Sequence, residues 1–164
     1  MRTAMWSLGL LAAFAVPAGA ADEITIAKVN VEEMQKAIAA EKGKIVVVDI
    51  WATFCAPCKE KFPHMVELHH KLKEKGVVFM SLSVDEADAE KDALAFLKDK
   101  KATFGNFLLV DTQKNKDAAE DKFATLSPPI VHVYGRDGKK VKTMEGKKEI
   151  GGLDKLLEEL IEKK

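Results

Sequence analysis

The sequence is poor in cysteine, has no net charge and contains no long hydrophobic run. Only two cysteines occur in 164 residues, and two residues separate them, so a disulfide between distant segments is excluded. The 26 basic and 26 acidic residues cancel, and no basic tract indicates binding to nucleic acid or to an anionic membrane surface. Repeats, linkers and low-complexity tracts are also absent, which favours a single domain with a real core.

The first apolar run is too short to span a bilayer comfortably, and it has the pattern of an export signal. Arg2 precedes the apolar residues 6–16, and small residues follow at 17–20. We therefore expect residues 1–20 to be a cleaved secretory signal and residues 21–164 to form the mature domain in the periplasm or another extracytoplasmic compartment. An uncleaved membrane anchor is the alternative. No cysteine follows the run, so a lipoprotein anchor is not expected.

Cys55 and Cys58 follow a strand-like run and stand at the predicted start of a helix. Two thiols at this spacing can close into a disulfide, and the first turn of a helix directs free N–H groups and the positive dipole end at the first sulfur. This arrangement favours the thiolate over the thiol. Because so short a loop adds little chain-entropy stabilisation, the pair indicates redox chemistry rather than a structural link.

A metal site is the alternative use of the two cysteines. Zinc needs further ligands, and the sequence contains no second cysteine pair. His64, His69 and His70 lie on the helix that follows, so a Cys-Cys-His site is conceivable. His64 stands one turn beyond the two cysteines, and this position is more typical of a helix-surface residue than of a metal ligand. We therefore expect neither a metal nor another cofactor.

Hydrophobic periodicity predicts alternating strands and helices. The β-branched run 45–50 indicates a central strand covered on both faces, and the turn 135–138 indicates a β-hairpin. The expected fold class is α/β, with a mixed central sheet and helices on both of its faces. Strands are expected at 24–29, 45–50, 77–84, 107–110, 130–134 and 139–145, and helices at 31–40, 56–75, 85–101, 117–123 and from 153 onward.

The segment 49–59, which reads DIWATFCAPCK, resembles the active-site segment of thioredoxin-fold proteins. More narrowly, the chain is similar to the exported TlpA/ResA-like thiol-disulfide oxidoreductases. Pro63 matches the proline that kinks the active-site helix of this family. Phe123, Pro129 and Gly138 reproduce its spacing from an aromatic residue to the cis-proline to the hairpin glycine. The resemblance therefore implies a thioredoxin-like fold for the mature chain.

The resemblance implies that Cys55 is the nucleophile and that Cys58 is the resolving thiol, with exchange proceeding in two steps through a mixed disulfide. It also implies that Pro129 is cis and that the neighbouring backbone pairs with an extended substrate segment. Pro128 departs from the family pattern because proline has no N–H to donate. Which of the two prolines follows the cis bond stays open at this point.

Asp49 stands at the position of the buried aspartate of thioredoxin, where a carboxylate can take a proton from the resolving thiol and return it. A surface aspartate at a strand end is the alternative, although the apolar neighbours favour burial. Strand alignment places Ser81 where thioredoxin has an accompanying lysine. We therefore predict that Lys61, where the ResA branch keeps an acid, is the cation coupled to Asp49. Trp51 and Phe54 are expected to pack around the sulfurs and form the rim of the site.

The leading hypothesis is an extracytoplasmic reductant of substrate disulfides, which the resemblance links to a membrane-bound electron donor and to apocytochrome c. Its partners would be protein thiols and disulfides, and a monomer is expected.

A disulfide-forming oxidant is less favoured because Ala56 and Pro57, and no histidine, stand between the cysteines. A thiol peroxidase is a further enzymatic alternative. A metal chaperone using Cys55, Cys58 and His64 is the alternative that is not an enzyme.

Overall fold

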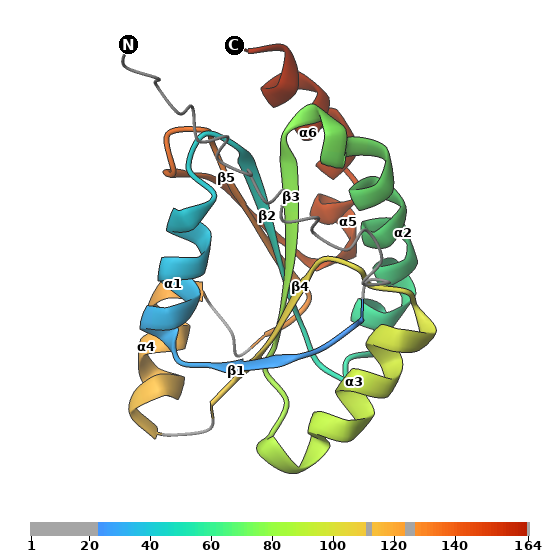
Figure 1. Ribbon diagram of the computed structural model, residues 1–164, viewed down its shortest axis with the longest axis vertical. Helices are drawn as coiled ribbons and strands as arrows, with labels where there is room; N and C mark the ends of the chain where they lie inside the picture. Colours follow the sequence, from blue (N-terminus) through green and yellow to red (C-terminus); the bar gives the residue numbers. More distant parts are fainter. Residues whose placement is uncertain (1–22, 111–112, 124–126, 164) are drawn as a thin grey trace, which may run out of the picture.

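The computed structural model describes residues 23–110, 113–123 and 127–163, which build one sheet with helices packed on it (Figure 1). The predicted export signal at residues 1–20 lies outside these residues. Within the described part of the chain, no helix has the length and apolar character needed to cross a membrane.

The sheet is mixed, as predicted. Its first four strands are parallel to one another, and the last two are antiparallel to their neighbours. Their order across the sheet is β1 (Ala27–Val29), β4 (Gly105–Leu109), β3 (Val77–Ser83), β2 (Ile45–Trp51), β5 (Ile130–Tyr134) and β6 (Lys140–Glu145). Every residue of β2 is buried, as expected for a central strand covered on both faces.

Helices cover both faces of the sheet, and the predicted α/β class is confirmed (Figure 1). One face carries α1 (Val31–Ala40) and α4 (Gln113–Phe123). The other face carries α2 (Ala56–Leu72), α3 (Glu90–Asp99), α5 (Gly146–Ile150) and α6 (Leu153–Glu162). The 3₁₀ turns Lys73–Lys75 and Ala87–Ala89 complete the described elements.

Strand alternation decides which β2 side chains face the CxxC helix. Val46 and Val48 pack into the core beneath α1 and α4, whereas Val47 packs into the core beneath α2 and α6. Because successive side chains of a strand point to opposite faces, Asp49 and Trp51 point to the same side as Val47. Both side chains therefore lie beneath the helix that carries the cysteines.

Several boundaries differ from those predicted. The first strand begins at Ala27 rather than residue 24, and the predicted helix 85–101 is a 3₁₀ turn followed by α3. The short helix α5 was not predicted, and Gly146 begins it with a positive φ of 66°. The capping box at Asn30 is present, since its side chain accepts the N–H of Glu33 at 2.9 Å while the Glu33 carboxylate accepts the N–H of Asn30 at 2.8 Å.

Candidate active site

Cys55 and Cys58 form a disulfide at the N-terminus of α2, with an S–S bond of 2.00 Å. Cys55 is the N-cap residue of the helix, and its sulfur accepts the N–H of Cys58 at 3.3 Å. Pro57 occupies the first turn, where a missing N–H removes no helical hydrogen bond. Cys55 is 6% exposed and Cys58 is 0% exposed. Both cysteines are buried, and only Cys55 keeps a small exposed fraction.

The residues around the disulfide form an apolar rim above an aromatic floor. Phe54, directly before Cys55, is 75% exposed, and Ala56 and Pro57 are exposed beside it. Trp51 is fully buried and packs on Phe62 and Phe96, with ring centroids 5.3 and 4.9 Å away. Trp51 therefore supports the site from below, while Phe54 is free to contact a protein surface.

Asp49 and Lys61 form a buried ion pair. The Lys61 ammonium donates to Oδ1 of Asp49, and the two side chains are 10% and 2% exposed. Lys61 lies three residues after Cys58 on α2, so it stands on the same face of the helix as the buried sulfur. The structure therefore brings the Asp49 carboxylate of β2 against the face of α2 that carries Lys61 and Cys58.

Burial and the neighbouring cation act on Asp49 in opposite directions. Burial raises the pKa of the Asp49 carboxyl above its ordinary value of 3.8, and the Lys61 ammonium opposes this rise. Oδ2 of Asp49 is buried and has no hydrogen-bond partner among the described residues. The carboxyl group therefore has one oxygen held by Lys61 and one oxygen available to carry a proton.

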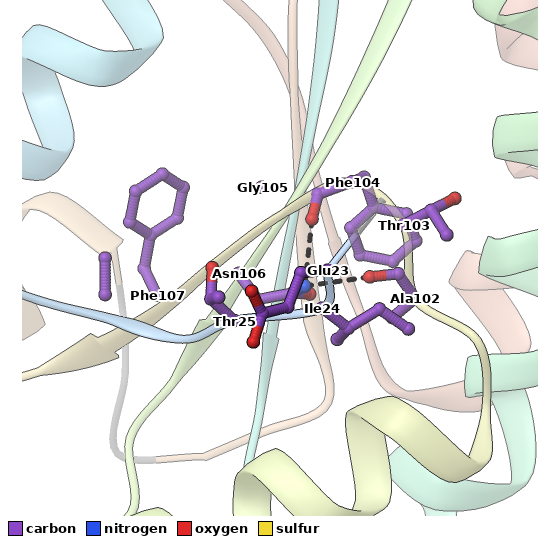
Figure 2. A pocket seen from close by; sticks show the side chains of 10 residues that line it. Glu23, Ile24, Thr25, Ala102, Thr103, Phe104, Gly105, Asn106 and Phe107 are labelled. Carbon is purple, nitrogen blue, oxygen red and sulfur yellow. Dashed lines mark hydrogen bonds between the residues drawn. The ribbon is translucent and has the colours of Figure 1, made fainter. Parts of the chain in front are cut away.

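Ser81 occupies the position beside Asp49 on β3, as the strand alignment predicted. Its hydroxyl donates to Oδ1 of Asn106 at 2.9 Å, so it supplies no cation to Asp49. The Asn106 amide in turn donates to the carbonyls of Ala102 and Phe104 (Figure 2). Asn106, Ala102 and Phe104, but not Ser81, line an open hollow of about 650 Å³ to which none of the predicted site residues contributes.

The cis peptide bond joins Pro128 to Pro129, so Pro129 is the cis-proline. The pairing of Ile130 with Ile50 places Pro129 beside the end of β2, at the edge of the sheet where α2 begins.

The following strand is tied to α4 by His132, a buried residue for which no role was predicted. One ring nitrogen of His132 lies 2.8 Å from the carbonyl oxygen of Phe123, and burial lowers the pKa of the imidazole.

His64 points toward α6. Its Nε2 lies 2.8 Å from Oδ1 of Asp154, and its side chain is 46% exposed. Within the described part of the chain, no group of three or more His, Cys, Asp or Glu side chains is arranged to hold a metal ion.

A second buried carboxylate, Asp85, was missed from the sequence. The sequence pattern placed Asp85 at the start of a helix, but its side chain turns back to the loop before the cysteines. Its Oδ1 accepts the Thr53 hydroxyl at 2.6 Å and the Thr53 N–H at 2.9 Å. Parallel pairing of β2 and β3 could have indicated the contact of Asp85 with Thr53, because it brings residues just beyond both strands to one edge of the sheet.

Residues 17–127 match the AhpC/TSA family. The chain belongs to the AhpC/TSA family. Relatives of this AhpC/TSA protein include the thiol-disulfide oxidoreductase ResA of Bacillus subtilis, which is 31% identical over 64% of this chain and 55% of the relative. ResA of Bacillus thuringiensis is 49% identical over 29% of this chain and 27% of the relative. The chain thus spans about half or less of the length of these curated relatives.

Solved structures show the same fold. A thiol:disulfide interchange protein of the thioredoxin family from Chlorobium tepidum has a TM-score of 0.60 at 20% identity, covering 75% of this chain and 83% of its own. The thioredoxin domain of a thiol-disulfide oxidoreductase from Bacteroides vulgatus has a TM-score of 0.58 at 21% identity, covering 72% and 82%. These structures confirm the thioredoxin-like fold, and the ResA relatives confirm the predicted resemblance to TlpA/ResA-type proteins.

Proposed function

We propose that this AhpC/TSA-family protein is a thiol-disulfide oxidoreductase that reduces substrate disulfides. The observation that carries the proposal is the Cys55–Cys58 disulfide at the N-terminus of α2, in which Cys55 keeps a small exposed fraction and Cys58 has none. A helix N-terminus stabilises a thiolate, and a thiolate is the species that attacks a disulfide.

The reduced protein acts in two balanced steps. The Cys55 thiolate attacks one substrate sulfur, so that a Cys55–substrate bond forms, the substrate S–S bond breaks and the second substrate sulfur leaves as a thiolate. Cys58 then loses its proton and attacks Cys55, which releases the first substrate sulfur and closes the Cys55–Cys58 disulfide. Two electrons have then passed to the substrate, and the protein is oxidised.

Asp49 is the proposed general base of the second step. Cys58 is a thiol that must lose its proton before it attacks, and a carboxylate with a raised pKa accepts a proton more readily than an ordinary aspartate. The unpartnered Oδ2 is the oxygen that would receive this proton, directly or through water. Lys61 would keep the other oxygen in place.

The apolar rim is the proposed contact surface for protein substrates. Phe54, Ala56 and Pro57 supply exposed side chains next to Cys55, and Pro129 lies at the same edge of the sheet. We propose that an extended substrate segment lies between this rim and the backbone before Pro129. Because Pro128 has no N–H, the pairing there would depend on carbonyl oxygens of the protein.

Export, reduction by a membrane-bound donor and apocytochrome c as a substrate are the finer parts of the proposal. The apolar run followed by small residues before Ala21 supports export of a mature domain over residues 21–164. Similarity to the ResA proteins supports the class of reaction. Trapping with a Cys58→Ser variant expressed at its native level, followed by identification of the captured proteins, tests the substrate.

We expect the Cys55–Cys58 couple to be reducing, nearer the roughly −270 mV of thioredoxin than the roughly −120 mV of DsbA. The physical reason is that Ala56 and Pro57 offer no charge or imidazole to stabilise the Cys55 thiolate further. Equilibration with glutathione buffers of graded ratio measures the potential. A value above about −150 mV would instead support the disulfide-forming oxidant.

Two assays separate the remaining alternatives. The dithiol protein, incubated with hydrogen peroxide in the absence of a disulfide substrate, should consume peroxide no faster than a Cys55→Ser/Cys58→Ser control. Rapid consumption would support a thiol peroxidase. Metal content after mild purification, compared between wild type and His64→Ala, tests the chaperone, for which stoichiometric metal lost on this substitution would be required.

A further inference from the structure

Asp85 is a buried carboxylate outside the Cys55, Cys58 and Asp49 set, and it is directed at the loop that carries Cys55. The residue is 3% exposed. Its two oxygens accept the N–H of Thr53 at 2.9 and 3.0 Å, Oδ1 accepts the Thr53 hydroxyl at 2.6 Å, and Oδ2 accepts the Ser83 hydroxyl at 2.7 Å. These four hydrogen bonds tie the Asp85 carboxylate to the loop before Cys55 and to the end of β3.

The surroundings of Asp85 contain donors but no paired cation. Thr53 and Ser83 are uncharged, and no ion pair joins Asp85 to a lysine or arginine among residues 23–110, 113–123 and 127–163. The next residue, Glu86, is different, because it is exposed and pairs with Lys116 at 2.8 Å. The negative charge of Asp85 therefore acts on its surroundings without local neutralisation.

The contact lies close to the reactive sulfur along the chain. Thr53 is two residues before Cys55, so the two Cα atoms are at most about 7 Å apart. The N–H of Cys55 donates to the carbonyl of Ala52 at 3.1 Å, which folds the loop back on itself. Asp85 thus fixes the segment from which Cys55 is presented and places a negative charge near it.

We propose that Asp85 is a positioning residue that holds the Cys55 loop through Thr53 and, by its charge, keeps the Cys55–Cys58 couple reducing. A nearby negative charge disfavours the Cys55 thiolate, which exists only in the dithiol form. The dithiol form is thereby destabilised relative to the disulfide, so electrons are passed to substrates more readily. This inference rests on the proposed exchange chemistry at Cys55.

The test is the equilibrium of each variant with glutathione at pH 8. In this reaction two glutathione thiols are oxidised to one glutathione disulfide while the Cys55–Cys58 disulfide is reduced to two thiols. Asp85→Asn keeps the shape and an acceptor oxygen but removes the charge. We expect its equilibrium constant to move about fivefold toward the dithiol, which corresponds to about 20 mV. Glu86→Gln is the matched control, since it removes one acidic charge at the adjacent exposed residue, and it should leave the constant unchanged.

A second variant, Ser83→Ala, is expected to shift the glutathione equilibrium in the opposite direction. This test does not depend on whether Asp85→Asn folds. Ser83→Ala removes one donor from Oδ2, so the carboxylate charge is less compensated and the equilibrium should move about twofold toward the disulfide. Far-ultraviolet circular dichroism checks that each variant is folded. Equal constants for Asp85→Asn and Glu86→Gln, or a shift of Ser83→Ala toward the dithiol, would overturn the role of Asp85 while leaving the proposed exchange intact. A wild-type protein that does not exchange with glutathione would overturn both.

Discussion

Cys55→Ser reduces no disulfide substrate, whereas Cys58→Ser still attacks and accumulates as a mixed disulfide: this is the largest effect that we expect in this protein. The reason is that Cys55, the N-cap residue of α2, keeps a small exposed fraction, while Cys58 has none. A hydroxyl at position 55 supplies no thiolate, so turnover should fall to background. A hydroxyl at position 58 leaves the first step intact and removes only the resolving attack.

Intact-protein mass spectrometry with a disulfide-containing peptide measures both outcomes. Reduced Cys58→Ser should gain the mass of one peptide half within about tenfold of the wild-type attack time, and the adduct should persist until another thiol is added. The Cys55→Ser/Cys58→Ser double variant is the control for non-specific association. Capture of the peptide by Cys55→Ser but not by Cys58→Ser would reverse the two roles.

Lys61→Met is expected to have the second-largest effect, because it leaves the Asp49 carboxylate buried without its cation. Methionine keeps the length and most of the apolar stem of lysine, so the change removes mainly the charge. Breaking a buried pair in this way costs about 3 kcal/mol of the free energy of unfolding when the remaining group stays ionised. Urea denaturation at pH 8 measures this loss. Lys59→Met, a change of the same kind at an exposed position on α2, should cost far less.

The pH dependence of this loss has a definite sign. Burial already raises the pKa of Asp49 above 3.8, so from that pH upward the folded state retains a proton that the unfolded state has released. Stability therefore falls as pH rises through this window, and it is largest at its acidic end. We expect Lys61→Met to raise the pKa of Asp49 further, so that stability decreases with pH over a wider range and by a larger amount. The difference between wild type and Lys61→Met should thus grow as the pH rises through the range in which Asp49 ionises.

The Asp49–Lys61 ion pair also predicts that substitutions of the two residues have non-additive effects on the rate of thiol-disulfide exchange. If Asp49 is the base for Cys58, the gain in rate on the alkaline side should move to higher pH in Lys61→Met, since the carboxyl group loses its proton later. In an Asp49→Asn background, Lys61→Met should change the rate little. A double-mutant cycle of rates across pH measures the coupling. Additive effects at every pH would show that Lys61 acts only on stability.

The predicted features that agree with the structure are those set by local chemistry. The β-branched run before Cys55 indicated a buried strand, since β-branched residues on both faces are typical of a central strand. The turn at residues 135–138 closes the hairpin of β5 and β6, as its local residues indicated. The spacing of Cys55 and Cys58 was itself sufficient for a disulfide at a helix start.

Features that depend on distant segments were predicted partly or not at all. The Asp49–Lys61 contact was expected because both flank the active-site turn and because Ser81 supplies no charge. The role of Asp85 was missed, since Asp85 lies 32 residues from Thr53 and nothing local distinguishes it from a helix-capping aspartate. Boundaries such as the start of β1 depend on pairing with β4 rather than on local pattern.

By itself, the sequence determined the redox pair, the alternation of strands and helices and the polarity of the CxxC helix, because each follows from residues within a few positions of one another. Only the tertiary structure decided which cysteine keeps some exposure, which proline follows the cis bond and which carboxylates face the active-site loop and helix. The physical reason is that burial and charge pairing arise when β2, β3 and α2 pack together. A carboxylate such as Asp85 acquires its partners only from that packing.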